Sequence, residues 1–266
     1  MKYVLVTGAY GGMGTAVVDM LKNKGYFVFA MDKRVGEKDQ NVMPVQADIT
    51  DTLSIQNAFE IIKSKTDKLY AIIHLAGIYD LDSLIEISEQ RFTRAFEINV
   101  FGAYRINKVF RPMLSKNSRV VITTSELAPL YPLPFTSIYA ITKTALDNYA
   151  YALKMELQLF DIHVSILRPG AVNTSLLKDS TDALSRFCEN TKDYSVNAKK
   201  FREIVDKVEA KKIAPVKIAN KILKIVKAKK PKIVYKINRN PLLLLLNVLP
   251  LRMQTWIIKK ILKTKT

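Results

Sequence analysis

A tyrosine and a lysine four residues apart, Tyr139 and Lys143, are the side chains of this sequence best suited to proton transfer. Four residues are slightly more than one helical turn, so the phenol and the ammonium would share one face of a helix. A free phenol loses its proton at about pH 10, and a cation held beside it favours the phenolate. The pair therefore predicts a general acid and base that works near neutral pH.

A glycine-rich turn, Thr7-Gly8-Ala9-Tyr10-Gly11-Gly12-Met13-Gly14, lies close to the N-terminus. Residues 2–7 before it have the pattern of a buried strand, and residues 15–24 after it have that of an amphipathic helix. Strand, glycine turn and helix form the unit that binds the phosphates of a dinucleotide, because the helix N-terminus presents free N–H groups. An ordinary strand-to-helix turn is the alternative interpretation.

An acidic residue, Asp32, ends the second expected strand, residues 26–31. A carboxylate at this place can accept hydrogen bonds from the ribose hydroxyls of adenosine, and it would repel a 2′-phosphate. The expected cofactor is therefore NAD. Lys33 and Arg34 follow directly and could attract that phosphate, so NADP stays possible.

Strands and helices alternate along most of the chain. The expected strands are residues 2–7, 26–31, 42–46, 69–75, 119–124 and 162–167, and the expected helices lie near 13–24, 52–65, 88–114 and 137–160. This alternation predicts an α/β fold with a doubly wound, Rossmann-like parallel sheet. With 266 residues, of which 48% are apolar, the chain is long enough for one such domain. We place it in residues 1–235, followed by a helical, basic and apolar extension in 236–266.

In their order these motifs resemble the short-chain dehydrogenase/reductase family, in its compact single-domain branch, over roughly residues 1–175. The matching stretches are Thr7 to Gly14 (TGxxxGxG), Ala47-Asp48-Ile49, His74-Leu75-Ala76-Gly77, Ile98-Asn99-Val100, Ser125, Tyr139 with Lys143 (YxxxK) and Pro169 to Thr174 (PGxVxT).

The resemblance implies a catalytic set of Asn99, Ser125, Tyr139 and Lys143. Tyr139 would exchange a proton with the substrate oxygen, which Ser125 would hold by a hydrogen bond. Lys143 would lower the pKa of Tyr139 and bind the nicotinamide ribose, and Asn99 would position a water molecule for proton relay. No metal is expected. The residues expected at the cofactor are Gly8, Tyr10, Gly11, Gly12, Met13, Gly14, Asp32, Lys33, Asp48, Ile49, Ala76, Gly77, Asn99, Tyr139, Lys143, Pro169, Gly170, Val172 and Thr174.

Two features depart from the family pattern. His74 stands where the family usually has asparagine, and we expect a core histidine with a satisfied hydrogen bond rather than a catalytic group. The serine and tyrosine are fourteen residues apart, one more than usual, which the loop 126–136 can absorb. Thr123 and Thr124 stay possible substitutes for Ser125, which we prefer because it lies at the end of its strand.

The positive charge is concentrated near the C-terminus. Residues 199–266 carry 20 Lys and Arg against 3 Asp and Glu, whereas residues 1–198 carry 22 against 21. The same region contains the apolar run 241–251, which is shorter than the roughly 20 residues that cross a bilayer. Arg252 and Lys259 interrupt any longer span. We therefore expect no transmembrane segment.

Three interpretations of residues 241–262 compete. Leucines, a tryptophan and lysines together favour an element that lies in the interface of an anionic membrane. The second interpretation is a helical edge that packs on the substrate cleft or on a second subunit. Nucleic-acid binding is the least favoured, because aromatic stacking platforms and a known binding motif are missing.

The segment 175–200 is the expected substrate lid. Its apolar residues Leu176, Leu177, Leu184 and Phe187 could line a pocket, and they suit packing equally well. The substrate itself is not encoded in any motif here.

The resemblance extends to membrane-associated hydroxysteroid and retinol dehydrogenases, which implies an NAD-dependent enzyme for a lipophilic secondary alcohol or ketone. The alternatives are a soluble reductase of carrier-bound or small polar ketones and a non-catalytic dinucleotide-binding regulator. The family also implies a homodimer or homotetramer built on the helices near 88–114 and 137–160. A lone cysteine, Cys188, and a strand that begins at residue 2 without a signal peptide favour the cytoplasm or the cytoplasmic face of a membrane.

Overall fold

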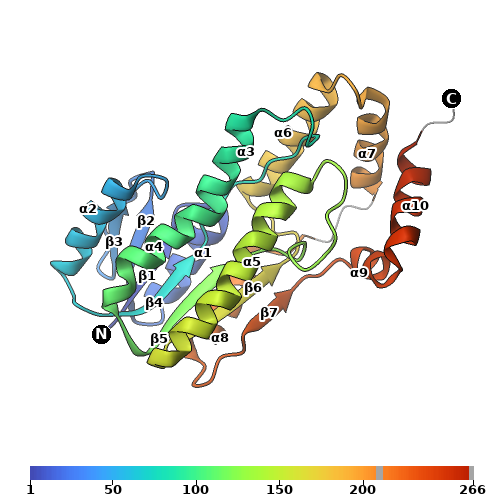
Figure 1. Cartoon of the computed structure of the whole chain (residues 1–266). Coiled ribbons are helices and arrows are strands. Elements are labelled where there is room, and N and C mark those ends of the chain that lie inside the picture. The colour runs from blue at the N-terminus through green and yellow to red at the C-terminus, as the bar shows by residue number, and fades with distance from the viewer. Residues whose placement is uncertain (208–211, 264–266) are drawn as a thin grey trace.

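The computed structural model describes residues 1–207 and 212–263, without the side chains of 175–179, 206 and 207. Within these residues, seven parallel strands form one sheet in the order β3-β2-β1-β4-β5-β6-β7 (Figure 1). The strands are β1 Lys2–Thr7, β2 Tyr26–Asp32, β3 Val42–Gln46, β4 Leu69–His74, β5 Leu114–Thr123, β6 His163–Pro169 and β7 Val234–Ile237. The predicted Rossmann-like α/β fold is confirmed.

Helices cover both faces of the sheet. They are α1 Gly12–Lys22, α2 Thr52–Lys63, α3 Glu89–Phe96, α4 Gly102–Phe110, α5 Ser137–Leu157, α6 Ser175–Asn190, α7 Ser195–Lys207, α8 Pro215–Lys227, α9 Pro241–Val248 and α10 Leu251–Leu262. Side chains that alternate along β1 enter two different cores. Val4 and Val6 pack with α1 and α8, while Leu5 packs with α2, α4 and α5. The strand is thus buried on both faces, as a parallel sheet requires.

The helix expected at 88–114 is interrupted. A π-helical turn, Glu97–Phe101, separates α3 from α4, and a 3₁₀ turn that contains Pro112 ends the helical stretch at Met113. Proline lacks the N–H that a continuing helix needs. Strand β5 therefore begins at Leu114, before the predicted residue 119.

A seventh strand, β7, was not predicted. It pairs with β6 from Val234 to Ile237 and so continues the sheet across the boundary placed between residues 235 and 236. Only four residues long and partly exposed at the sheet edge, it lacks the apolar run by which the other strands were recognised.

The extension beyond β7 is helical, as predicted. At one end of the molecule, α10 lies beside α7, and α9 adjoins α10 (Figure 1). In the part of the chain that the structure describes, no helix combines the length and the apolar character needed to span a membrane.

Candidate active site

The turn between β1 and α1 is shaped for close approach to a ligand. Gly8 has φ of +68°, and a Cβ atom there would lie 2.6 Å from the backbone nitrogen of Ala76. Helix α1 begins at Gly12 without a side-chain cap from Gly11 and without an acidic residue in its first turn. Its N-terminus therefore fits the phosphates of a dinucleotide, because the backbone N–H groups and the helix dipole favour an anion.

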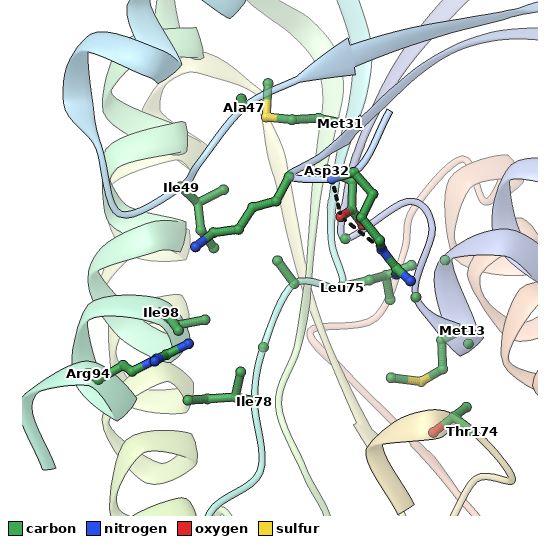
Figure 2. Close-up of a pocket in the computed structure, with 18 residues that line it drawn as sticks. Met13, Met31, Asp32, Ala47, Ile49, Leu75, Ile78, Arg94, Ile98 and Thr174 are labelled. Atoms are coloured by element: carbon green, nitrogen blue, oxygen red, sulfur yellow. Dashed lines mark hydrogen bonds and ion pairs between the residues drawn. The ribbon is translucent and has the colours of Figure 1, made fainter. Parts of the chain in front are cut away.

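A cavity of about 440 Å³ lies at this turn, beside the carboxyl ends of β1 and β4. These strands are where the order of the sheet reverses, the usual ligand site of a doubly wound fold. Figure 2 shows Ile49, Ile98 and Arg94 on one side of the cavity and Met13 and Thr174 on the other. The predicted cofactor residues that line it are Gly8, Gly11, Gly12, Met13, Gly14, Asp32, Lys33, Ile49, Ala76, Gly77 and Thr174.

Asp32 stands at the end of β2 with its carboxylate turned toward the glycine turn. It accepts hydrogen bonds from the backbone N–H groups of Tyr10, at 3.0 Å, and of Arg34, at 3.1 Å. The guanidinium of Arg34 forms an ion pair with the same carboxylate, at 3.6 Å. A carboxylate and an exposed cation thus lie side by side where the adenosine ribose of a dinucleotide would sit.

Several of the predicted cofactor residues do not line this cavity, Asp48 and Tyr10 among them. Asp48 accepts hydrogen bonds from the N–H and O–H groups of Thr50 and pairs with Lys33 at 2.8 Å. The phenol oxygen of Tyr10 is buried and has no hydrogen-bond partner among the residues that the structure describes. Arg94, which lines the cavity from α3, was missed, because no motif marks it.

The four predicted catalytic residues come together beside this cavity. Tyr139 and Lys143 lie one turn apart on α5, with the Lys143 Nζ 5.7 Å from the centre of the Tyr139 ring. Ser125 follows β5 and forms a hydrogen bond with Tyr139. The hydroxyl of Thr124 instead donates to Asp147, at 3.0 Å, so Ser125 is the residue that reaches the tyrosine.

Asn99 holds the loop after β4 rather than pointing freely into the cavity. Its Oδ1 accepts the N–H of Ile78 at 2.8 Å, and its Nδ2 donates to the carbonyl of Ile78 and the hydroxyl of Thr142, both at 3.0 Å. The π-helical turn that contains Asn99 widens the helix at this point, a feature common at functional sites. Gly77 lies close to this site, since a Cβ atom there would lie 3.1 Å from Asn99 Oδ1 and 3.3 Å from Lys143 Nζ.

Burial shifts the pKa values of Tyr139 and Lys143 toward their neutral forms, and the predicted effect of Lys143 on Tyr139 stays a prediction. Burial raises the pKa of Tyr139 to about 12, although the hydrogen bond with Ser125 opposes this shift. Burial also lowers the pKa of Lys143 to about 8. Both side chains are more than nine-tenths buried, and removal from water disfavours each charged form. Desolvation is therefore the largest influence on both pKa values.

A second cavity, of about 540 Å³, opens above these residues. It adjoins the first, since Met13, Leu75, Gly77, Ile78 and Thr174 line both. Its polar end is formed by Ser125, Tyr139 and Lys143, next to the predicted cofactor residues Pro169, Gly170 and Val172. The apolar side chains farther out are Phe201, Ile204 and Val205 of α7, Leu242, Leu243 and Leu246 of α9, and Ile258, Ile261 and Leu262 of α10.

Among the side chains that the structure describes, the predicted lid contributes less to this cavity than the extension does. Leu184 and Phe187 pack into a separate cluster with Phe135 and Phe201. Leu176 and Leu177 lie outside the described side chains. Sequence patterns could not distinguish these packing residues from pocket residues, because both are apolar residues at helical spacing.

His74 is a structural residue, as expected. Its Nε2 lies 2.9 Å from Asn107 Oδ1, and Asn107 in turn donates to the hydroxyl of Tyr149 at 3.1 Å. Burial lowers the pKa of His74 to about 4, against a smaller opposite effect of Asn107. The imidazole is therefore neutral at physiological pH and joins β4 to α4 and α5.

Comparison with known proteins agrees with this geometry. The family model described as short chain dehydrogenase matches residues 2–185. The 3-ketodihydrosphingosine reductase of Bacteroides thetaiotaomicron is 27% identical over 229 residues, which cover 86% of this chain and 84% of that protein. Estradiol 17-beta-dehydrogenase 2 of Mus musculus is 31% identical over 189 residues, or 66% of this chain and 49% of that protein, so this chain spans about half of its length.

Solved structures match the whole fold. A short-chain dehydrogenase from Streptomyces avermitilis aligns with a TM-score of 0.79 at 22% sequence identity. The alignment covers 98% of this chain and 96% of that one.

Proposed function

The chain belongs to the short-chain dehydrogenase/reductase family of NAD(P)-dependent oxidoreductases, and on this premise we propose that it interconverts a secondary alcohol and a ketone of a lipid, with NAD as cofactor. One observation carries the proposal. Tyr139 and Ser125 form the polar end of a cavity whose outer walls are apolar. A lipophilic ketone would place its oxygen at this end and its hydrocarbon along the walls of α7, α9 and α10.

The reaction needs a proton and a hydride. When bound, the reduced cofactor would supply the hydride, and Tyr139 donates its phenolic proton to the carbonyl oxygen of the substrate. The high pKa of Tyr139 suits this direction, because the phenol stays protonated at neutral pH. Ser125 holds the same oxygen through its hydroxyl. In the reverse direction the phenolate accepts the proton of the alcohol.

The proposed substrate is a lipid of the size of a steroid or a long-chain sphingoid base. The relatives named 3-ketodihydrosphingosine reductase and estradiol 17-beta-dehydrogenase 2 support this class. The cavity supports it as well, since leucines and isoleucines of the extension form much of its wall. NAD is preferred over NADP because the Asp32 carboxylate would repel a 2′-phosphate.

The direct test follows absorbance of the reduced cofactor with 3-ketodihydrosphingosine, estradiol, a retinol and small polar or carrier-bound ketones. We expect turnover of a lipid substrate with NAD. Tyr139→Phe should abolish turnover while NAD binding, measured by calorimetry, persists. Tyr131→Phe, a change of an exposed tyrosine that does not line either cavity among the described residues, is the matched control and should leave turnover unchanged.

Other outcomes would identify the alternatives. Turnover confined to small polar or carrier-bound ketones would contradict the lipid substrate. Undiminished turnover of Tyr139→Phe would contradict the mechanism. Cofactor binding without turnover of any substrate, with biological function retained by Tyr139→Phe, would identify a regulator.

We also propose a homodimer or homotetramer built on α4 and α5. Phe101 and Tyr104 at α4, and Tyr151 and Met155 on α5, are apolar or aromatic side chains that remain exposed in the single chain. Light scattering at several protein concentrations measures the assembly, and a monomer throughout would contradict it.

A further inference from the structure

The two helices of the extension carry apolar side chains on more than one face. Leu243 and Leu246 of α9 and Ile258 of α10 line the second cavity. Other apolar residues of these helices point to solvent: Leu245 is 65% exposed, Val248 82%, Leu251 52%, Met253 49% and Trp256 61%. Five exposed apolar side chains on two short neighbouring helices point to an interaction surface, since soluble proteins rarely leave large apolar patches uncovered. We call these five exposed residues and the adjoining cations the outer face.

The outer face contains basic side chains, and the segment that forms it contains no acidic residue. Arg252, Lys259 and Lys260 are exposed on α10, and residues 236–266 contain no Asp or Glu. None of these three cations takes part in an ion pair with any residue that the structure describes. The charge therefore remains available for an anionic partner.

Trp256 lies between two of these cations. Arg252 precedes it by one turn and Lys260 follows it by one turn, with the Lys260 Nζ 5.8 Å from the centre of the indole ring. Tryptophan prefers the level of lipid headgroups, where its ring is partly buried and its N–H stays wet. Cations at the same level meet the phosphates of anionic lipids.

The extension is held to the body of the protein by hydrogen bonds that leave the outer face free. The backbone N–H of Tyr131 donates to Asn247 Oδ1 at 2.9 Å, and Asn197 Nδ2 donates to the carbonyl of Leu262 at 2.8 Å. These bonds fix α9 and α10 over the second cavity.

We propose that the outer face docks this protein on an anionic lipid bilayer, and that its lipid substrate passes from the bilayer into the second cavity between α9, α10 and α7. The route rests on the proposed function, whereas the docking does not. The same two helices form the wall of the cavity and the surface in contact with lipid. A water-insoluble substrate therefore never needs to cross the aqueous phase.

Charge and chemistry favour a bilayer over other occupants. Two copies of this surface would bring uncompensated cations together, which opposes association. Nucleic acid would use the cations but not the exposed leucine, valine and methionine side chains. A bilayer with anionic headgroups is complementary to the cations and to the exposed apolar side chains at the same time.

The sequence provides its own probe, since Trp256 is the only tryptophan. Vesicles of phosphatidylcholine with phosphatidylserine should shift its emission to shorter wavelength and protect it from acrylamide. Vesicles of phosphatidylcholine alone should do so at least about tenfold more weakly, because each basic residue near an anionic surface adds about 1 kcal/mol. No shift with anionic vesicles would overturn the docking, and so would a preference for duplex DNA over vesicles.

Charge variants test the face itself. The triple variant Arg252→Gln, Lys259→Gln, Lys260→Gln should bind anionic vesicles roughly a hundredfold more weakly, from three such contributions. The matched control, Lys217→Gln, Lys224→Gln, Lys227→Gln, removes the same charge from exposed positions of α8 and should change binding by less than about threefold. Equal losses of vesicle binding in the two triple variants would show that binding responds to net charge alone, and they would overturn the assignment of the outer face.

Turnover then tests the route. The triple variant should lose most of its activity on a lipid ketone supplied in anionic vesicles and keep its activity on a short-chain ketone in water. Unchanged activity on the vesicle-borne ketone would overturn the route. Absence of all turnover, with the Trp256 shift intact, would count against the proposed function and leave the docking standing.

Discussion

The carboxylate of Glu126 accepts a hydrogen bond from the backbone N–H of Asn240, with 2.6 Å between Oε2 and nitrogen. Glu126 directly follows Ser125, and Asn240 caps the N-terminus of α9 through its own side chain. Only 7% of Glu126 is exposed. Burial raises its pKa, while the Asn240 hydrogen bond and nearby Arg239 oppose the shift. This contact joins the catalytic loop to the extension that closes the second cavity.

We expect Glu126→Ala to loosen α9 from the cavity. The substitution leaves the Asn240 N–H without its acceptor, a loss of about 1–3 kcal/mol for a buried group. The KM for a lipid substrate should rise about tenfold or more, in line with that energy. Hydrogen exchange of residues 241–249 should become faster.

Glu126→Gln is the matched control, since its amide oxygen can accept the same hydrogen bond. It should keep exchange and KM near those of the wild type. If the alanine and glutamine variants behaved alike, the hydrogen bond would not be what holds α9.

Replacement of Asp32 should change the choice of cofactor. Like charges about 4 Å apart near a protein surface repel by about 4 kcal/mol, so the carboxylate strongly disfavours a 2′-phosphate. Asp32→Ala removes this repulsion and leaves Arg34 free to pair with the phosphate. The ratio of kcat/KM for NADP to that for NAD should rise at least about tenfold.

Arg34→Ala provides the opposite change at the same site. It should lower the use of NADP and spare that of NAD. A ratio that did not respond to Asp32→Ala would assign the discrimination to other residues of the cavity, such as Lys33 or Arg94.

Lys143 should reduce the stability of the fold. Its pKa is about 8 in the folded chain, against 10.5 for the free side chain, so the unfolded state binds its proton more tightly. The penalty is fully present below pH 8, amounts to about 3 kcal/mol, and disappears as the pH rises to 10.5. Lys143→Met should therefore be more stable than the wild type at neutral pH.

The measurement is the free energy of unfolding in urea for both proteins between pH 7 and 10.5. Their difference should shrink as the pH rises, because the wild type gains stability from loss of the buried charge. A difference independent of pH would show that Lys143 acts through packing alone.

Local patterns explain which parts of the site could be predicted. Gly8, Asp32, Tyr139 and Lys143 are recognisable because each satisfies a short-range requirement of turn or helix geometry, and the structure brings all four to one edge of the sheet. The pKa of Tyr139 could not be predicted, because it depends on burial by residues from several elements. Spacing alone carries no information on burial.

Long-range contacts explain what could not be predicted. The side-chain amide of Asn99 donates hydrogen bonds to the carbonyl of Ile78 and the hydroxyl of Thr142, which are 21 and 43 residues away in the sequence. The contact of Glu126 with Asn240 spans 114 residues. Residues 241–262 form part of the wall of the second cavity. Their attachment to a membrane remains a prediction.

A buried ion pair joins α5, the helix that carries Tyr139 and Lys143, to strand β6. Arg168 on β6 donates to both carboxylate oxygens of Asp147, at 2.9 and 2.5 Å, and Asp147 lies one turn after Lys143 on α5. The same carboxylate accepts the hydroxyl of Thr124, the neighbour of Ser125. Asp147 thus fixes the helix that carries Tyr139 relative to the strand that precedes the serine.

We expect Asp147→Asn to reduce both stability and turnover. Loss of one partner leaves Arg168 buried and unpaired, at a cost of about 3–5 kcal/mol in the free energy of unfolding. The kcat should fall about tenfold or more with little change in KM, because the proton-transfer geometry is disturbed while the apolar walls remain. The double variant with Arg168→Met should recover part of the stability, since it removes the unpaired charge. If the losses in free energy of unfolding of the two single variants simply added in the double variant, the ion pair would not be what stabilises this site. A change in KM without a change in kcat would contradict the role of the pair in positioning the helix.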